Sequence, residues 1–229
     1  MYFQKFPYTF YTLDDRKTTQ LIQNILIRNK INDEVKNSFV LYDEYDVRDG
    51  DTPEILAYKF YGDSNLHWLI LHMNEILDPR FDWPLDTRKF QDYLNSKYPD
   101  INGIDHYEDS NENPINGNVI LNASVFNNFN VGDVVYNLSS KGIGYITSSS
   151  STSIIVTTTE GGFKAGNLIS NNIVGTSQAT ITSTTSITGT PVTFYIAEDR
   201  ANEAKRRVRI LKPQFVSAII AEFDRKIAE

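Results

Sequence analysis

Hydrophobic and polar residues alternate along one segment in the first half of the chain, and this alternation predicts a strand. Between residues 38 and 47, one face of an extended segment carries Phe39, Leu41, Tyr45 and Val47. A period of two is typical of a strand with one buried face. The turn at residues 49–51, which contains a central glycine, would end it.

Helical spacing of apolar residues precedes and follows this strand. From Thr18 to Ile31 the leucine and isoleucine positions recur as on an amphipathic helix. Thr52 is a good N-cap residue and Pro53 suits the first helical position, where a missing N–H costs nothing. A short helix is therefore predicted from Pro53 to about Tyr61.

A second helix is predicted after Gly62, with Asp63 or Ser64 as its cap. Its apolar positions form one helical stripe: Leu66, Leu69, Ile70, Met73 and Leu77.

The dipeptide at residues 78–79 ends in proline and breaks this helix. Residues 81–85 can return as a short strand, and Asp86 or Thr87 can cap a third helix that carries Phe90 and Leu94. Residues 38–98 are therefore predicted as β, α, α, β, α.

Composition changes after the turn at residues 116–117. From there to about Ser186 the chain consists largely of Ser, Thr, Asn, Gly and β-branched residues, with few Lys or Arg. Such a segment favours strands. After Pro191 a strand at residues 208–211 and an amphipathic helix from Pro213 are predicted. The predicted organisation is one domain at residues 1–116 and 191–229, interrupted by a β domain at residues 117–190.

The β segment contains a weak internal duplication. Residues 129–137 align with residues 163–171, and residues 146–148 align with residues 181–183. Two units too small to bury their own faces would pack together into a small sandwich or barrel. The alternative is chance similarity in a low-complexity Ser/Thr sequence.

Composition and charge restrict the class of protein. With 40% hydrophobic residues and 13 each of Phe and Tyr, the 229 residues can fold without disulfides, and the chain has no cysteine. A formal charge of −7 gives no overall attraction to nucleic acid or anionic membrane. No run approaches the roughly 18 apolar residues of a membrane span. We therefore expect no nucleic-acid partner and no membrane.

No constellation of residues indicates catalysis. His67 and His72 lie five positions apart, whereas two ligands on one helix need a spacing of about three or four. His106 stands among acidic residues, but no nucleophile accompanies it, and a solvated loop is the simpler interpretation. Nucleotide, metalloprotease and hydrolase motifs are absent. We predict no enzyme, no catalytic residue, no cofactor and no metal.

Aromatic and basic residues are the candidates for protein contacts. The aromatic N-terminus is either an edge strand of its own domain or an arm that docks on a neighbour. Trp68 and Trp83 can anchor a core or an interface, and we expect one to be buried and the other partly exposed. The candidate interface residues are Tyr2, Phe3, Phe6, Tyr8, Tyr61, Trp68, Trp83, Arg206 and Arg207.

The run at residues 45–57, Tyr-Asp-Val-Arg-Asp-Gly-Asp-Thr-Pro-Glu-Ile-Leu-Ala, resembles the opening of a LysM module. In that module a strand ends in Gly-Asp-Thr and leads directly into a short helix. The resemblance implies a groove beside this turn that binds N-acetylglucosamine-containing glycans. Its candidates here are Gly50, Asp51, Thr52 and Leu77.

The next segment is similar to a phage family. Residues 60–75 contain Tyr61-Gly62, Trp68-Leu69-Ile70 and Asn74, and resemble the baseplate wedge subunit fifty-three family of contractile-tailed, T4-like bacteriophages. Residues 202–211 and the final helix look like the same family's C-terminus. The resemblance covers residues 1–116 and 190–229, and the Ser/Thr-rich insert departs from it.

The resemblance implies a virion protein of the tail baseplate, made in the host cytoplasm, that links neighbouring wedge proteins during assembly. Other baseplate wedge proteins are the expected partners, with neighbouring copies of the chain as further candidates. The expected fold is α+β, with a LysM-like βααβ core, extra helices and an all-β insert. The alternative function is binding of peptidoglycan or another glycan.

Overall fold

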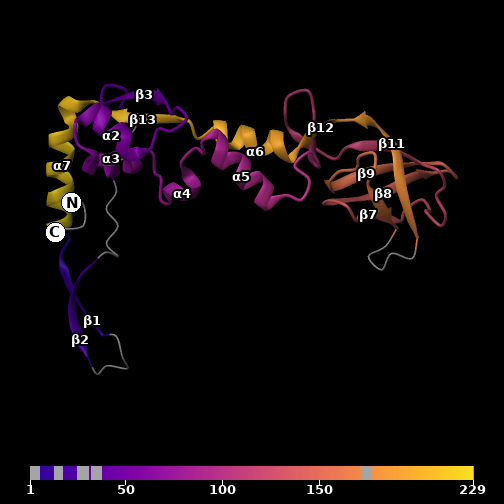
Figure 1. Cartoon of the computed structure of the whole chain (residues 1–229), viewed down its shortest axis with the longest axis horizontal. Helices are drawn as coiled ribbons and strands as arrows, with labels where there is room; N and C mark the ends of the chain where they lie inside the picture. The colour runs from indigo at the N-terminus through magenta and orange to yellow at the C-terminus, as the bar shows by residue number, and fades with distance from the viewer. Residues whose placement is uncertain (1–5, 13–17, 25–30, 32–37, 172–176, 229) are drawn as a thin grey trace. The chain divides into compact units, whose positions relative to one another are not determined.

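The computed structural model describes residues 6–12, 18–24, 31, 38–171 and 177–228 (Figure 1). The chain divides into two compact units, residues 1–86 with 202–229 and residues 87–201. Helices and strands are mixed in both, so the fold is α+β as predicted. None of the helices formed by the described residues is both long and apolar enough to cross a bilayer. The predicted domain boundaries, at residues 116 and 191, stay a prediction.

The first unit is built on two strands that lie far apart in the sequence. Strand β3 (Tyr42–Asp46) pairs antiparallel with β13 (Arg207–Leu211), and Tyr45 lies opposite Val208. In Figure 1 the two strands run side by side next to helices α2 (Pro53–Tyr61) and α3 (His67–Met73). The resulting order is strand, helix, helix, strand, with the last strand supplied from beyond residue 200.

The strand predicted at residues 81–85 is wrong. Helix α4 (Pro79–Asp82) takes up the first two of these residues. Asp78 caps it by accepting the Arg80 amide at 3.0 Å, and proline occupies its first turn. The second helix ends at Met73, before the break that the sequence predicts at residues 78–79. The place of the second strand is taken by β13 instead.

The end signals of helix α2 are confirmed. Thr52 accepts the Ile55 amide at 3.3 Å, and Gly62 ends the helix in the left-handed conformation at φ 75°. The predicted second helix is shorter than expected: a 3-10 turn η2 (Ser64–Leu66), capped by Asp63, precedes α3. Leu77 lies beyond α3 and is 67% exposed, so it does not belong to the buried stripe.

Two apolar clusters hold this unit together. Helix α7 (Pro213–Ala228) packs on α3, where the Trp68 and Phe223 rings lie 4.6 Å apart between centroids. The second cluster joins Leu56 and Ile70 to Val208 and Trp83. Trp68 is 8% exposed and Trp83 is 7% exposed, so both are buried, and the expectation that one would be partly exposed was wrong.

The N-terminal part forms a hairpin of strands β1 (Tyr8–Thr12) and β2 (Thr19–Gln23). The helix predicted from Thr18 to Ile31 is therefore wrong over residues 19–23, and residues 25–30 lie outside the described residues. Residues 19–23 include two β-branched residues, Thr19 and Ile22, so this short segment suits a strand as well as a helix. Its pairing with β1 decides for the strand.

The second unit begins with the predicted third helix, α5 (Thr87–Lys97), which buries Phe90 and Leu94. Helix α6 (Phe194–Glu203) contacts it through Glu198, whose carboxylate accepts from Lys97 and Tyr98 at 2.6 Å each. A three-stranded sheet follows in the order β12 (Thr190–Thr193), β4 (Ile104–Glu108), β5 (Pro114–Ile115).

The Ser/Thr-rich segment forms a closed barrel, which is one of the two architectures, sandwich or barrel, that the sequence predicts. Its strands are β6 (Asn118–Ala123), β7 (Val134–Asn137), β8 (Gly142–Ser149), β9 (Ser153–Gly161), β10 (Leu168–Ser170) and β11 (Gln178–Thr188). They close in the order β10-β11-β6-β9-β8-β7. Side chains such as Leu121, Ile146 and Phe163 fill the interior.

The barrel confirms the internal duplication. Strands β6, β7 and β8 correspond to β9, β10 and β11. Strand β6 pairs with its equivalent β9, with Ile120 opposite Ile155, and β7 pairs with its equivalent β10. The turns before β7 and β10 make the same bonds: the amides of Gly132 and Gly166 donate to the carbonyls of Ile146 and Ile181, each at 2.8 Å. Both glycines have φ near 90° (92° and 87°), which other residues rarely adopt. Chance similarity does not explain this repeated geometry.

Candidate functional site

The β1–β2 hairpin exposes apolar side chains on both of its faces. Phe10 lies opposite Leu21 on one face, and Tyr11 and Ile22 lie on the other. Phe10 is 78% exposed and Tyr8 is 66% exposed. Neither strand contains a charged residue. A two-stranded ribbon of this kind gains little stability by itself and has the composition of a docking element.

Phe6 connects this ribbon to the body of the first unit. It is buried in the cluster formed by α3, β13 and α7, and the amide of Asn24 donates to the carbonyl of Pro7 at 2.8 Å. Tyr2 and Phe3, the first two candidates of the aromatic arm, lie outside the described residues. The described part of the arm is thus a buried anchor followed by an exposed ribbon.

Three of the four groove candidates from the LysM resemblance have structural roles in the turn after β3. The Asp51 carboxylate accepts from the Tyr45 hydroxyl at 2.8 Å and the Arg48 amide at 3.0 Å. The Asp51 carbonyl accepts from the Trp83 indole at 3.0 Å. Gly50 adopts φ 88°, and Thr52 caps α2.

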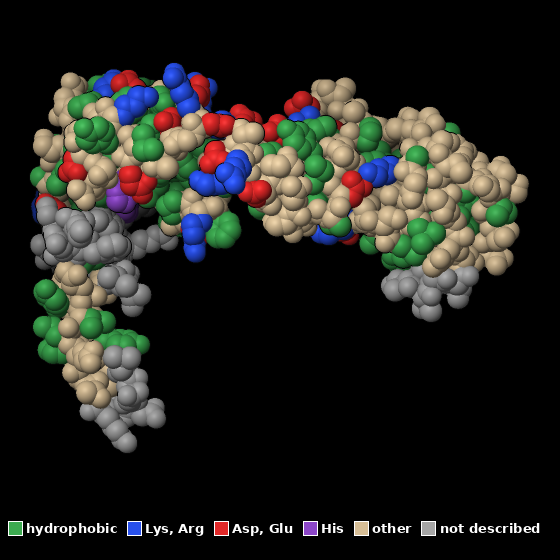
Figure 2. Space-filling view, in the orientation of Figure 1, with side chains coloured by type: hydrophobic (Ala, Val, Ile, Leu, Met, Phe, Trp, Pro, Cys, Tyr) green, Lys and Arg blue, Asp and Glu red, His purple; other side chains and the backbone are tan. Residues whose placement is uncertain are grey.

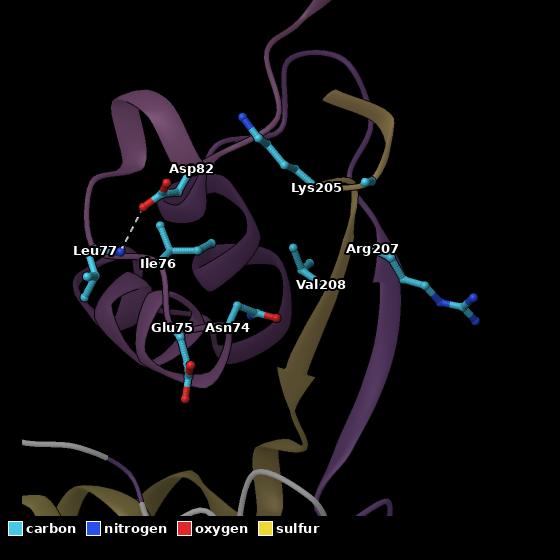
Figure 3. A pocket seen from close by; sticks show the side chains of 9 residues that line it. Asn74, Glu75, Ile76, Leu77, Asp82, Lys205, Arg207 and Val208 are labelled. Atoms are coloured by element: carbon cyan, nitrogen blue, oxygen red, sulfur yellow. Dashed lines mark hydrogen bonds between the residues drawn. The ribbon is translucent and has the colours of Figure 1, made fainter. Parts of the chain in front are cut away.

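Leu77, the fourth groove candidate, lines a cleft of about 400 Å³ that the other three do not line (Figure 3). The cleft lies between the loop after α3 and the start of β13. Its lining residues are Asn74, Glu75, Ile76, Leu77, Asp82, Ala204, Lys205, Arg207 and Val208. A site shared by the four residues stays a prediction.

The basic candidates are both in ion pairs. Arg206 contacts Glu203 at 2.6 Å and Asp49 at 3.1 Å, and it also donates to the Val47 carbonyl, so it holds the turn before β13 against β3. Arg207 pairs with Glu44 across the two strands at 2.5 Å, and its side chain is 71% exposed. Figure 2 shows basic and acidic side chains intermixed over the first unit.

The remaining candidates from the family-like segment are buried. Trp68 belongs to the α7 cluster and Trp83 to the cluster around Leu56. Among the described residues the Tyr61 hydroxyl has no hydrogen-bond partner, and burial raises the pKa of Tyr61 well above its usual range. Contact of these residues with a partner stays a prediction.

His106 lies on strand β4, so the predicted solvated loop was wrong. Its Nδ1 is 2.7 Å from Asp105 and its Nε2 is 2.9 Å from Glu108, whose two carboxylate oxygens each accept from Arg200 at 2.8 Å. Asp105 and Glu108 are sequence neighbours, whereas Arg200 comes from α6 and carried no sequence signal. Among the described residues no three acidic or histidine side chains are placed to hold a metal ion.

An exposed apolar ribbon and a shallow cleft are features of a protein that acts through contacts with other proteins. The comparison with family models agrees, because the model for base plate wedge protein 53 matches residues 1–147, more than half of the chain. The chain belongs to this family and is a structural protein of the phage tail baseplate in the virion. No curated protein matches it.

The extent of the match differs from the resemblance seen in the sequence. It runs through β6, β7 and most of β8, which form the first repeat of the barrel, and it does not include residues 190–229. The first barrel repeat is thus part of the matched region, so the expectation that the whole insert departs from the family was wrong.

Proposed function

We propose that this protein links neighbouring baseplate wedge proteins during assembly, and that the β1–β2 hairpin is one of its docking elements. The observation that carries the proposal is the exposure of apolar side chains on both faces of an uncharged ribbon. The partners are other baseplate wedge proteins, and copies of this chain in adjacent wedges are further candidates. Family membership supports association with baseplate proteins in general.

The test is to mix the purified full chain with the other wedge proteins of its phage and to follow complex mass by light scattering. We expect a defined larger complex with the wild type. The double variant Phe10→Ser, Leu21→Ser should weaken it by about tenfold or more, because two facing apolar contacts are lost. Ile187→Ser, at an exposed apolar position on β11 outside the hairpin, is the control. A chain that stays monomeric with every component would contradict the proposal.

We further propose that the β3–α2–α3–β13 arrangement is a LysM-like module used for protein contact. The support is the order strand, helix, helix, strand with antiparallel outer strands. That same arrangement favours glycan binding as the second candidate function. The test that distinguishes protein contact from glycan binding is retention of the full chain on peptidoglycan or chitin columns, with a protein of similar charge as the control. Absence of retention removes glycan binding.

A further inference from the structure

The backbone groups on the edge of strand β13 that faces away from β3 are hydrogen-bonded by described residues at one position and not at another. The Val47 amide donates to the Arg206 carbonyl at 2.8 Å, and the Lys212 amide donates to the Leu41 carbonyl at 2.9 Å. Backbone groups alternate in direction along a strand, so Arg206 and Lys212 face β3 while Arg207 and Arg209 face the opposite edge. None of the strands formed by the described residues lies beside this outer edge.

Asn74 covers the Arg209 position of that edge with its side chain. Its Nδ2 donates to the Arg209 carbonyl at 2.9 Å, and its Oδ1 accepts from the Arg209 amide at 2.7 Å. The amide side chain therefore replaces one residue of a neighbouring strand. At Arg207, two residues earlier, the part of the chain that the structure describes supplies no hydrogen-bond partner to the outward N–H or C=O.

The cleft lies at this open position. Figure 3 shows Ile76 and Val208 pointing into the space between the α3–α4 loop and β13, while the Arg207 side chain points away from them. Because the Arg207 guanidinium pairs with Glu44, it is the main chain of Arg207 that borders the cleft. The cleft thus combines an apolar floor with one unpaired backbone donor and one unpaired acceptor.

Polar side chains on the rim are occupied within the unit. The Asp82 carboxylate accepts the amides of Leu77 and Asp78 at 3.2 and 3.1 Å. Lys205 donates to the Phe81 carbonyl at 2.8 Å. A sugar needs several well-placed polar groups for its hydroxyls, and the described residues that line the cleft include no aromatic side chain. An extended peptide needs only the backbone pair and an apolar pocket.

We propose that an extended segment of a neighbouring protein docks at this edge, forms main-chain hydrogen bonds with Arg207 and inserts one aliphatic side chain between Ile76 and Val208. The segment adds a short strand beside β13, in line with the position that Asn74 covers. This inference rests on the proposed linking function and names the chemistry of a second contact, separate from the β1–β2 hairpin.

The probe is a set of overlapping synthetic peptides, each of about 15 residues, that covers the other wedge proteins of the same phage. Binding of the full chain is measured by fluorescence anisotropy. Arg207→Pro removes the outward N–H, and proline is compatible with an edge strand. Arg207→Ala is the matched control, because it loses the Glu44 ion pair but keeps the N–H. Ala204→Trp fills the cleft from an exposed lining position and serves as a second variant.

We expect at least one peptide to bind the wild type and Arg207→Ala alike, and to bind Arg207→Pro and Ala204→Trp about tenfold more weakly or worse. Thermal unfolding checks that both variants are folded. The inference is overturned if no peptide binds, if the two variants bind as well as the wild type, or if chitotetraose binds in the cleft instead. Light scattering with whole wedge proteins distinguishes the linking function from docking at the cleft. If the cleft variants still form normal complexes, docking at the cleft is contradicted and the linking function is not.

Discussion

At the scale of single residues, the charge state of His106 follows from its neighbours. Each ring nitrogen lies within hydrogen-bond distance of a carboxylate, from Asp105 on one side and Glu108 on the other. An ionised carboxylate only accepts, so both contacts are hydrogen bonds when each ring nitrogen carries a proton, and this geometry favours the cationic ring. Partial burial lowers the pKa of His106, but the hydrogen bonds to Asp105 and Glu108 outweigh it, and the net pKa is raised. Arg200 first, and His106 second, lower the pKa of Glu108.

This arrangement predicts a pH dependence of the second unit's stability. Because the pKa of His106 is higher in the folded chain, its contribution is fully present below the pKa of the unfolded chain and is lost as pH rises through the raised value. The NMR titration of the His106 ring should have its midpoint above the usual 6.5. Asp105→Asn removes one carboxylate and should lower that midpoint. A midpoint at or below 6.5 in the wild type would refute the cationic network.

Residue roles were predictable from sequence where they depend on near neighbours. Thr52 and Gly62 cap α2 as expected, because a cap is a contact within a few residues of the chain. Asn74 belongs to the segment that resembles the wedge family, yet its contact is with Arg209, 135 positions away. Arg200 similarly reaches Glu108 across 92 positions. The sequence carries no local signal for either contact.

At the scale of elements, the errors concern short segments whose pairing partner is remote. Residues 81–85 were predicted as the second strand of the core, but β13 pairs with β3 instead. Residues 19–23 were predicted as helical, but they pair with β1. The candidate docking surface was therefore predicted only as an aromatic arm. Its ribbon form depends on a pairing that periodicity does not reveal.

The duplicated turns of the barrel predict unequal costs for equivalent substitutions. The Asp133 carboxylate accepts the Asn130 amide at 2.8 Å in an exposed turn. Asn167 accepts the Lys164 amide at the same distance and also the buried Nδ2 of Asn137 at 2.9 Å. We expect Asp133→Ala to lower the free energy of unfolding by about 1 kcal/mol and Asn167→Ala by about 2 kcal/mol, because the second change also disrupts a buried contact.

Urea unfolding followed by circular dichroism measures both values. Asp133→Asn is the control, since it keeps the turn acceptor and copies the residue of the second repeat, and it should change stability little. Equal losses for the two alanine variants would mean that the buried contact of Asn167 contributes nothing. No loss in either would mean that the repeated turns do not stabilise the barrel.

At the scale of the whole molecule, the separate cores predict two unfolding transitions. The barrel cluster contains Ile146, and its described members do not occur in the two clusters of the first unit, one of which contains Leu69. Compact units with their own cores tend to unfold independently. Calorimetry of the full chain should therefore show two heat-absorption peaks.

Substitutions in each core assign the two peaks. Ile146→Ala and Leu69→Ala each remove a fully buried side chain and should cost about 2–5 kcal/mol. The first should lower the midpoint of one peak and the second should lower that of the other. A single peak that both variants shift equally would show that the chain unfolds as one cooperative body. In that case a partner bound to the first unit would also stabilise the barrel. If there are two peaks, a partner bound at the hairpin or the cleft would raise the midpoint of one peak only.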